Sequence, residues 1–126
     1  MTATGPRDLE MTDAAGVTAR LRRWVPLGAW LAASWRETGR IVGYRDEEDV
    51  LYPVCQFDAA GLPLLEMRKV IVALRPVMGE AAIVGWLGTG CTLLGGARPA
   101  DLLGAPSSAA VGEAARATAR EMAQAA

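Results

Sequence analysis

The chain has 126 residues, a formal net charge of −1 and a composition that is 52% apolar. This length suits one domain or two very small ones, and this apolar content is not that of a disordered chain. The absence of histidine excludes Ser-His-Asp and Cys-His catalytic sites and removes the commonest transition-metal ligand.

Two helices are predicted at the start of the chain. The first is capped at Thr12 or Asp13 and runs to about Arg23, and the second runs from Pro26 to a stop at Gly39. Both carry apolar residues at helical spacing. The expected stripes are Leu9, Val17 and Leu21 in the first helix and Leu27, Trp30, Leu31 and Trp35 in the second.

A short β-hairpin is predicted after Gly39. Apolar residues at 41–44 and 50–52 flank the acidic run Asp46–Asp49, and Pro53 ends the second strand. We expect the four acids to form a solvated four-residue loop at the tip, because a calcium loop would need spaced ligands and a glycine turn.

The stretch YPVCQFDAAGLP joins this hairpin to the second part of the chain. Residues Asp58 to Gly61 have the chemistry of a turn. Pro63 then opens a third helix, which Pro76 ends or kinks. The expected apolar face of that helix comprises Leu64, Leu65, Met67 or Val70, Ile71 and Leu74.

Three further helices are predicted in the rest of the chain. One runs from Glu80 to Leu87, a short one follows Pro99, and a last one is capped by Ser107. We therefore expect a mainly α fold, a small helical bundle with a short β-hairpin between its N-terminal and C-terminal helical parts. The expected inward residues are Ile83, Trp86 and Leu87 in the first of these helices and Val111, Ala115, Thr118 and Met122 in the last.

Positive and negative charges are unevenly distributed along the chain. Residues 1–45 carry seven arginines against four acids, a balance of +3, whereas residues 46–126 balance to −4. The basic front is either a DNA-contacting region or a chance excess.

Cys55 and Cys91 lie in apolar runs without a CxxC pair, which indicates buried free thiols. The longest uncharged stretch, Ala81–Ala97, is too short for a membrane span, and no signal peptide is visible, so we expect a cytoplasmic protein.

Three elements in the second part of the chain resemble a known family when they are taken in order. Over roughly residues 39–115, their order and spacing are similar to those of the Xre/MbcA/ParS-type antitoxins. Upstream, WLAASWRETGRIVGYR is similar to the end of the helix-turn-helix that family members often carry, although its helices look shortened. The three elements are Tyr52, Pro53, Gln56, Phe57 and Asp58; then Trp86 and Leu87; then Leu94, Gly96, Pro99, Asp101, Leu102, Leu103 and Gly104.

This resemblance implies an antitoxin of a type II toxin-antitoxin pair. Its partner would be a RES-domain toxin, an NAD-consuming enzyme encoded by the neighbouring gene, whose active site it blocks sterically within an oligomeric complex. The chain itself would need no cofactor and perform no catalysis. Residues 1–58 would form the N-terminal helices and hairpin, and residues 59–126 the toxin-binding domain. The alternatives are a DNA-binding transcriptional autorepressor and a non-catalytic scaffolding domain.

The candidate site residues follow from the same resemblance, and each also has a structural interpretation. Trp86 could be a core anchor, Asp101 could serve the helix dipole, and the charges of the last helix could be a solvated face. Arg36 and Arg40 are candidates for phosphate contact if the front half binds operator DNA. The toxin-binding candidates are Trp86, Arg98, Pro99, Asp101, Leu102, Glu113, Arg116 and Arg120.

Overall fold

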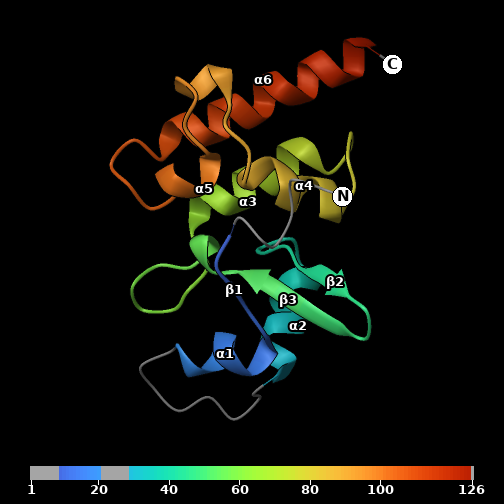
Figure 1. Ribbon diagram of the computed structural model, residues 1–126, viewed down its shortest axis with the longest axis vertical. Coiled ribbons are helices and arrows are strands. Elements are labelled where there is room, and N and C mark those ends of the chain that lie inside the picture. Colours follow the sequence, from blue (N-terminus) through green and yellow to red (C-terminus); the bar gives the residue numbers. More distant parts are fainter. Residues whose placement is uncertain (1–8, 21–28, 126) are drawn as a thin grey trace.

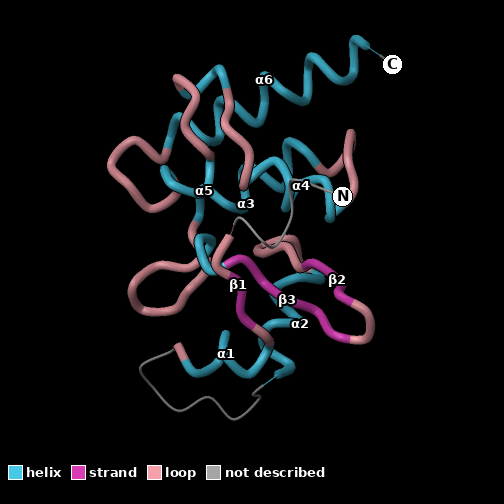
Figure 2. Tube along the Cα trace, viewed as in Figure 1, coloured by secondary structure: helices cyan, strands magenta, loops and turns pink. Residues whose placement is uncertain are grey.

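The computed structural model describes residues 9–20 and 29–125. Figure 1 shows a small antiparallel sheet in the middle of the molecule, with a helix at one end and most of the helices toward the other. The tube in Figure 2 shows the same division, with the strands beside α1 and α2 in the first part and helices joined by loops in the second. The fold is mainly α with a small antiparallel sheet, as the sequence predicts.

Five elements build the first part. They are β1 (Met11–Thr12), α1 (Ala14–Ala19), α2 (Ala29–Glu37), β2 (Tyr44–Asp46) and β3 (Asp49–Pro53). The sheet has the order β1-β3-β2, and both pairings are antiparallel. The hairpin of β2 and β3 is predicted, but its first strand lies at Tyr44–Asp46 rather than over residues 41–44. The strand β1 is not predicted, because two residues are too few to show an alternating pattern.

The caps of the first two helices agree with the sequence, but their apolar stripes agree only in part. The Asp13 carboxylate accepts a hydrogen bond from the Gly16 N–H at 2.8 Å, and Gly39 follows α2 with φ +77°. Val17 and Trp35 are buried as expected, whereas Trp30 is 77% exposed. The predicted stripe positions Leu21 and Leu27, and the predicted start at Pro26, lie outside the described residues.

The tip of the hairpin is tighter than predicted. Asp46 and Asp49 pair with each other as the last residues of their strands, so only Glu47 and Glu48 form the turn. Glu47 has φ +57°, which a two-residue hairpin turn requires. The expectation of a four-residue loop is therefore wrong, because antiparallel pairing continues through the acids, although all four remain exposed.

The joint between the two parts is a 3-10 turn followed by a side-chain-capped loop. After β3, η2 (Val54–Gln56) leads to Asp58, whose carboxylate accepts hydrogen bonds from the N–H groups of Ala60 and Leu62 at 2.8 and 2.9 Å. Gly61 has φ +87°, a conformation that glycine adopts without strain. The predicted turn is confirmed.

Helices of different lengths build the second part. They are α3 (Leu65–Leu74), α4 (Glu80–Leu87), η3 (Thr92–Leu94), α5 (Pro99–Leu102) and α6 (Ala109–Ala125). The bounds of α4 and the short helix after Pro99 are those that the sequence predicts. Within the described ranges, no helix is long and apolar enough to cross a membrane.

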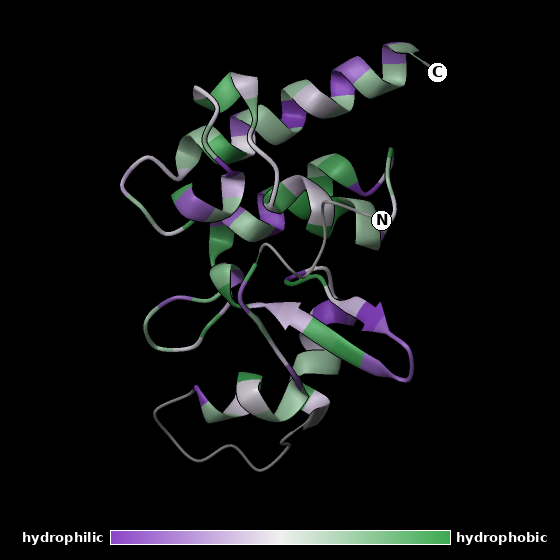
Figure 3. Cartoon of the chain, viewed as in Figure 1, coloured by the Kyte–Doolittle hydropathy of each residue, from purple (hydrophilic) through white to green (hydrophobic). Residues whose placement is uncertain are grey.

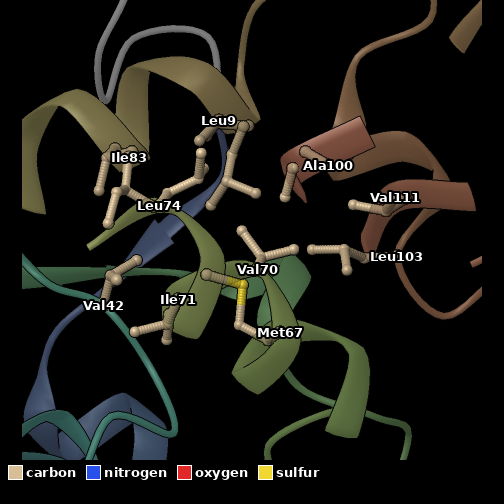
Figure 4. Close-up of a cluster of buried hydrophobic side chains, with 13 residues drawn as sticks. Leu9, Val42, Met67, Val70, Ile71, Leu74, Ile83, Ala100, Leu103 and Val111 are labelled. Carbon is tan, nitrogen blue, oxygen red and sulfur yellow. The ribbon is translucent and has the colours of Figure 1, made fainter. Parts of the chain in front are cut away.

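The buried side chains form two hydrophobic clusters. The N-terminal cluster is built from Val17, Ala32, Trp35, Ile41 and Tyr52. The larger C-terminal cluster is drawn in Figure 4, where side chains from α3, α4, α5 and α6 converge. Its labelled members are Leu9, Val42, Met67, Val70, Ile71, Leu74, Ile83, Ala100, Leu103 and Val111.

Two residues from the first part belong to the C-terminal cluster. Leu9 and Val42 pack with the helices of the second part, so Leu9 does not join the α1 stripe that the sequence suggests. Gln56 holds Val42 in place from the joint. The Val42 N–H donates to Gln56 Oε1 at 2.9 Å, and Gln56 Nε2 donates to the Val42 carbonyl at 2.8 Å. This fully buried amide satisfies both backbone groups of Val42.

Candidate partner-binding site

Helix α3 has apolar residues on two opposite faces. Met67, Val70, Ile71 and Leu74 are buried in the C-terminal cluster. On the outer face, Leu65 is 79% exposed and Val72 is 66% exposed. The apolar pattern of α3 predicts Leu65 in the core, and this prediction is wrong, because α3 packs on the side that centres on Met67 and Ile71. Leu65 and Val72 together form an exposed apolar patch, which a helix with a single core-facing stripe would not have.

A groove about 430 Å³ in volume lies along this outer face. It is called the α3–α6 groove. Its lining combines three apolar side chains with three basic ones, and five of the six residues come from α3. The lining residues are Leu65, Arg68, Lys69, Val72, Ala73 and Arg116.

A second hollow, of about 340 Å³, continues the groove toward the first part of the chain. The two hollows share Arg68 and Val72, so together they form one strip along α3. In this second hollow Arg75 lies over Gly39, with Nη1 3.4 Å from where a Cβ on that glycine would be. The residues lining the second hollow are Thr38, Gly39, Arg68, Ile71, Val72, Arg75 and Pro76.

Close packing of α6 against α3 forms one wall of the groove. A Cβ on Gly112 would lie 3.0 Å from Glu66 Oε2 and 3.7 Å from Lys69 Cβ, so the glycine permits this approach. The same Glu66 accepts a hydrogen bond from Lys69 Nζ at 2.9 Å through its other oxygen. Its Oε2 is buried without a hydrogen-bond partner among the described residues. The wall is therefore set by backbone proximity at Gly112.

The basic residues of the groove differ in how they are paired. Lys69 is bonded to Glu66, and Arg116 Nη2 donates to Glu113 Oε2 at 2.5 Å. Arg68 forms no hydrogen bond or ion pair with any residue in the described ranges, and it lies between Leu65 and Val72 on the exposed face. The groove therefore combines an apolar surface with at least one cation that has no carboxylate of its own.

The predicted residues of α4 and α5 lie outside this groove. Trp86 is half-buried and packs against the C-terminal cluster, as does Leu102. Pro99 is buried at the first turn of α5. Arg98 Nη2 donates to Asp101 Oδ1 at 2.8 Å, and this hydrogen bond lowers the pKa of the Asp101 carboxyl. These residues support local structure, and both charges are already paired with each other.

The predicted residues of α6 are divided between two regions. Arg116 lines the groove and pairs with Glu113, whereas Arg120 lies one turn farther along the helix and is exposed. Residues 120–125 are all exposed. Figure 1 shows the C-terminal end of α6 extending away at the upper right. Of the predicted toxin-binding residues, Arg116 alone is among those lining the groove.

Arg36 forms an ion pair with Glu80, a residue of the second part. Its Nε donates to Glu80 Oε2 at 2.8 Å and its Nη2 to Glu80 Oε1 at 2.6 Å, while the Gly43 N–H donates to the same Oε2 at 2.7 Å. The hydrogen bond to Glu80 raises the pKa of Arg36. Burial alone would raise the pKa of Glu80, but the bonds from Arg36 and Gly43 outweigh it and lower that pKa. Arg36 therefore joins the two parts of the molecule.

The surroundings of Arg40 and Cys55 limit the chemistry of both side chains. The guanidinium carbon of Arg40 lies 5.6 Å from the centre of the Trp35 ring, in the range of a cation–π contact. Burial raises the pKa of the partly buried Cys55 thiol to about 12, so this thiol stays protonated at neutral pH. No group of three or more metal-ligating side chains occurs in the described part of the chain.

The core-facing stripe predicted for α3 includes Leu65 and does not include Val72, so it does not indicate the groove. A signal for it was present. Leu65 and Val72 are seven residues apart, with Arg68 between them, which places all three on one helical face. That spacing describes a second apolar stripe opposite the one that faces the core.

Comparison with known proteins bears on the fold alone. No family model matches the chain, and no curated protein matches it either. The solved NMR structure of Rv2175c has a similar fold, with a TM-score of 0.74 and 22% sequence identity. The similarity covers 94% of this chain and 86% of that one. The chain therefore shares its mainly α fold with Rv2175c across nearly its whole length.

Proposed function

We propose that this chain is a non-catalytic antitoxin that binds a RES-type NAD-consuming toxin in the cytoplasm and blocks its active site. The observation that best supports the proposal is the α3–α6 groove. Exposed apolar surface rimmed by polar residues marks sites where proteins bind partners. Leu65 and Val72 supply the apolar centre here, and basic side chains supply the rim.

The mechanism we propose is steric. The groove anchors the toxin against α3, and the far end of α6 reaches toward its pocket. Residues 120–125 are exposed and helical, and they extend about 9 Å at 1.5 Å per residue. Inhibition of this kind needs the antitoxin to bind tightly and to exclude substrate, and it needs no reactive group on this chain.

The test is co-expression with the product of the neighbouring gene, followed by purification and an NAD-consumption assay. We expect the two proteins to co-purify and NAD loss to fall as this chain is added, reaching its minimum at the stoichiometry of the complex. A toxin that keeps full NAD consumption when saturated with this chain would disprove the proposal.

DNA binding is the second candidate function, and the first part of the fold favours it. Helices α1 and α2 pack together and are followed by the β2–β3 hairpin, which is the order of elements in a helix-turn-helix unit with a β-hairpin wing. In helix-turn-helix proteins the second helix lies in the major groove. By that geometry α2 would face the bases and the hairpin tip would approach the backbone.

The charges on the described surface oppose this second candidate. The hairpin tip carries four carboxylates, which appear as a strongly hydrophilic end in Figure 3, and these would repel phosphates. Arg36 is paired with Glu80, and the exposed residues of α2 include Trp30 and Glu37. We therefore rank protein binding first. Promoter DNA binding that weakens steeply with salt would reverse this order.

A further inference from the structure

We infer that the α3–α6 groove binds an amphipathic α-helix of the partner, with apolar side chains in the groove and carboxylates against its basic rim. The inference rests on the proposed function in that the partner is a protein, and it adds the chemistry and location of the contact. Neither the groove nor its occupant is predicted from the sequence.

The length and direction of the groove fit a helix. Leu65 and Val72 are two turns apart on α3, or about 10 Å along its axis at 1.5 Å per residue. A helix that docks in a groove presents anchors at i, i+3 or i+4, and i+7, which span the same length. The second hollow, past Val72 to Pro76, extends the strip by about another turn. An incoming helix would lie alongside α3 with α6 as its neighbour.

The positive charges along the strip favour a partner helix that carries acidic side chains. Arg68 lies in both hollows without a carboxylate partner in the described ranges, and Arg75 lines the second hollow. Lys69 and Arg116 add positive charge at the edge, and each has a glutamate of this chain beside it. Asp or Glu side chains that flank the apolar anchors of the partner would pair first with Arg68, because the charge of Arg75 already acts on Glu80 of this chain.

Other occupants fit less well. A second copy bound through the same face would bring one basic strip against another, because an isologous interface uses the same patch on both copies. The acidic hairpin tip of a second copy would bring carboxylates, but its four residues have no apolar side chain to fill the groove. A lipid surface is flat, whereas α6 makes this site concave.

A display library of helical peptides tests the chemistry without any knowledge of the partner. The library is randomised at both apolar and flanking positions and selected against the wild-type chain. We expect enriched peptides to carry apolar residues at helical spacing with Asp or Glu beside them. Their affinity should fall about tenfold or more for Leu65→Ser/Val72→Ser and for Arg68→Glu.

Matched variants separate the groove from general surface effects. Leu93→Ser removes another exposed leucine on η3, and Arg120→Glu reverses another exposed charge on α6 outside the groove. Both should bind the selected peptides as the wild type does. All four variants change exposed side chains and should keep the wild-type melting temperature. Enrichment of basic peptides, or no peptide binding above that of the Leu65→Ser/Val72→Ser variant, would overturn the inference.

Two further measurements address the other occupants. Binding to phosphatidylserine vesicles that is lost with Leu65→Ser/Val72→Ser would overturn the inference in favour of a lipid surface. A dimer in sedimentation equilibrium that the same variant dissolves would overturn it in favour of a second copy. If the toxin is inhibited equally by the wild type and the groove variants, the inference fails and the antitoxin proposal stands. If no toxin complex forms with the wild type, the antitoxin proposal fails.

Discussion

The two hydrophobic clusters differ in composition and in what they leave exposed. The N-terminal cluster depends on aromatic side chains, with Trp35 and Phe57 in a tilted contact at 6.2 Å and Tyr52 buried beside them. The buried members of the C-terminal cluster are aliphatic residues and methionine, supplied largely by helices. Aliphatic residues on opposite sides of α3 let one face fill the core while Leu65 and Val72 on the other face remain exposed.

The clusters are also connected across the joint. Leu9 and Val42 of the first part pack in the C-terminal cluster, and Gln56 forms hydrogen bonds to Val42. Arg36 of the first part also forms an ion pair with Glu80 of the second. A chain linked this way should unfold as one cooperative unit even though its apolar side chains form two groups. The predictions that follow test this link, from the largest expected effect to the smallest.

Removal of the largest side chain of the N-terminal cluster should have the greatest effect. We expect Trp35→Ala to lower the free energy of unfolding by about 3–5 kcal/mol, because Trp35 is buried and also carries the Arg40 contact. Urea unfolding followed by circular dichroism measures this. The transition should stay single and move to lower urea. A biphasic curve, with the second step unchanged, would show that the clusters are independent.

Leu74→Ala provides the corresponding test in the C-terminal cluster. Leu74 is fully buried, so its truncation should lower the free energy of unfolding by about 2–5 kcal/mol through lost burial and the cavity left behind. The same urea experiment applies. Loss of helix signal at a midpoint different from that of the aromatic near-ultraviolet signal would contradict the single cooperative unit.

Gln56→Leu should break the connection at the joint. The substitution leaves the buried N–H and carbonyl of Val42 unpaired, at a cost of about 2–3 kcal/mol. Gln124→Leu is the matched control, because Gln124 is exposed on α6 and should change stability by less than about 0.5 kcal/mol. Equal effects of the two substitutions would refute the bridging role of Gln56.

Arg36→Met should have a smaller effect that depends on pH. At neutral pH we expect a loss of about 1–2 kcal/mol, reduced by the partial exposure of the pair. The folded state lowers the pKa of Glu80 below the ordinary value of 4.5, so the stabilisation is full above that pH and disappears as pH falls below it.

The measurement is the difference in unfolding free energy between wild type and Arg36→Met across this range. The difference should shrink in acid. A difference that stays constant from neutral pH to well below 4.5 would mean that Glu80 is not the partner that matters. Arg120→Met, on the exposed end of α6, is the control and should show no such pH dependence.

Leu65→Ser/Val72→Ser should have the smallest effect on folding. Both side chains are mostly exposed, so we expect a change within about 0.5 kcal/mol of the wild type for each substitution. The contrast with Leu74→Ala, on the same helix, measures how different the two faces of α3 are. A loss as large as that of Leu74→Ala would show that the outer face is part of the core.

Much of the fold is predictable from interactions between residues that are close in sequence. The cap at Asp13, the turn from Asp58 to Gly61 and the bounds of α4 depend on residues close in sequence, and each is confirmed. The exposed positions of Trp30 and Leu65 do not follow from local chemistry alone. The spacing of Leu65 and Val72 indicates a second apolar stripe on α3, but neighbouring elements decide which stripe faces the core.

The candidate site was less predictable than the fold. Arg36 and Glu80 are forty-four residues apart, so nothing local in the sequence indicates their pairing. The groove needs the approach of α6 to α3 at Gly112, which is also a long-range contact. The residues implied by the resemblance to antitoxins remain predictions, and Arg116 is the one that also lines the groove.

Titration of the toxin's NAD consumption with this chain tests the central claim most directly. The neighbouring gene's product is purified and assayed with increasing amounts of the wild-type chain. We predict that NAD consumption falls in proportion to the amount of this chain added. At saturation of the complex, no NAD consumption should remain. Undiminished NAD consumption at saturation would contradict the claim that this protein works by covering a toxin's active site.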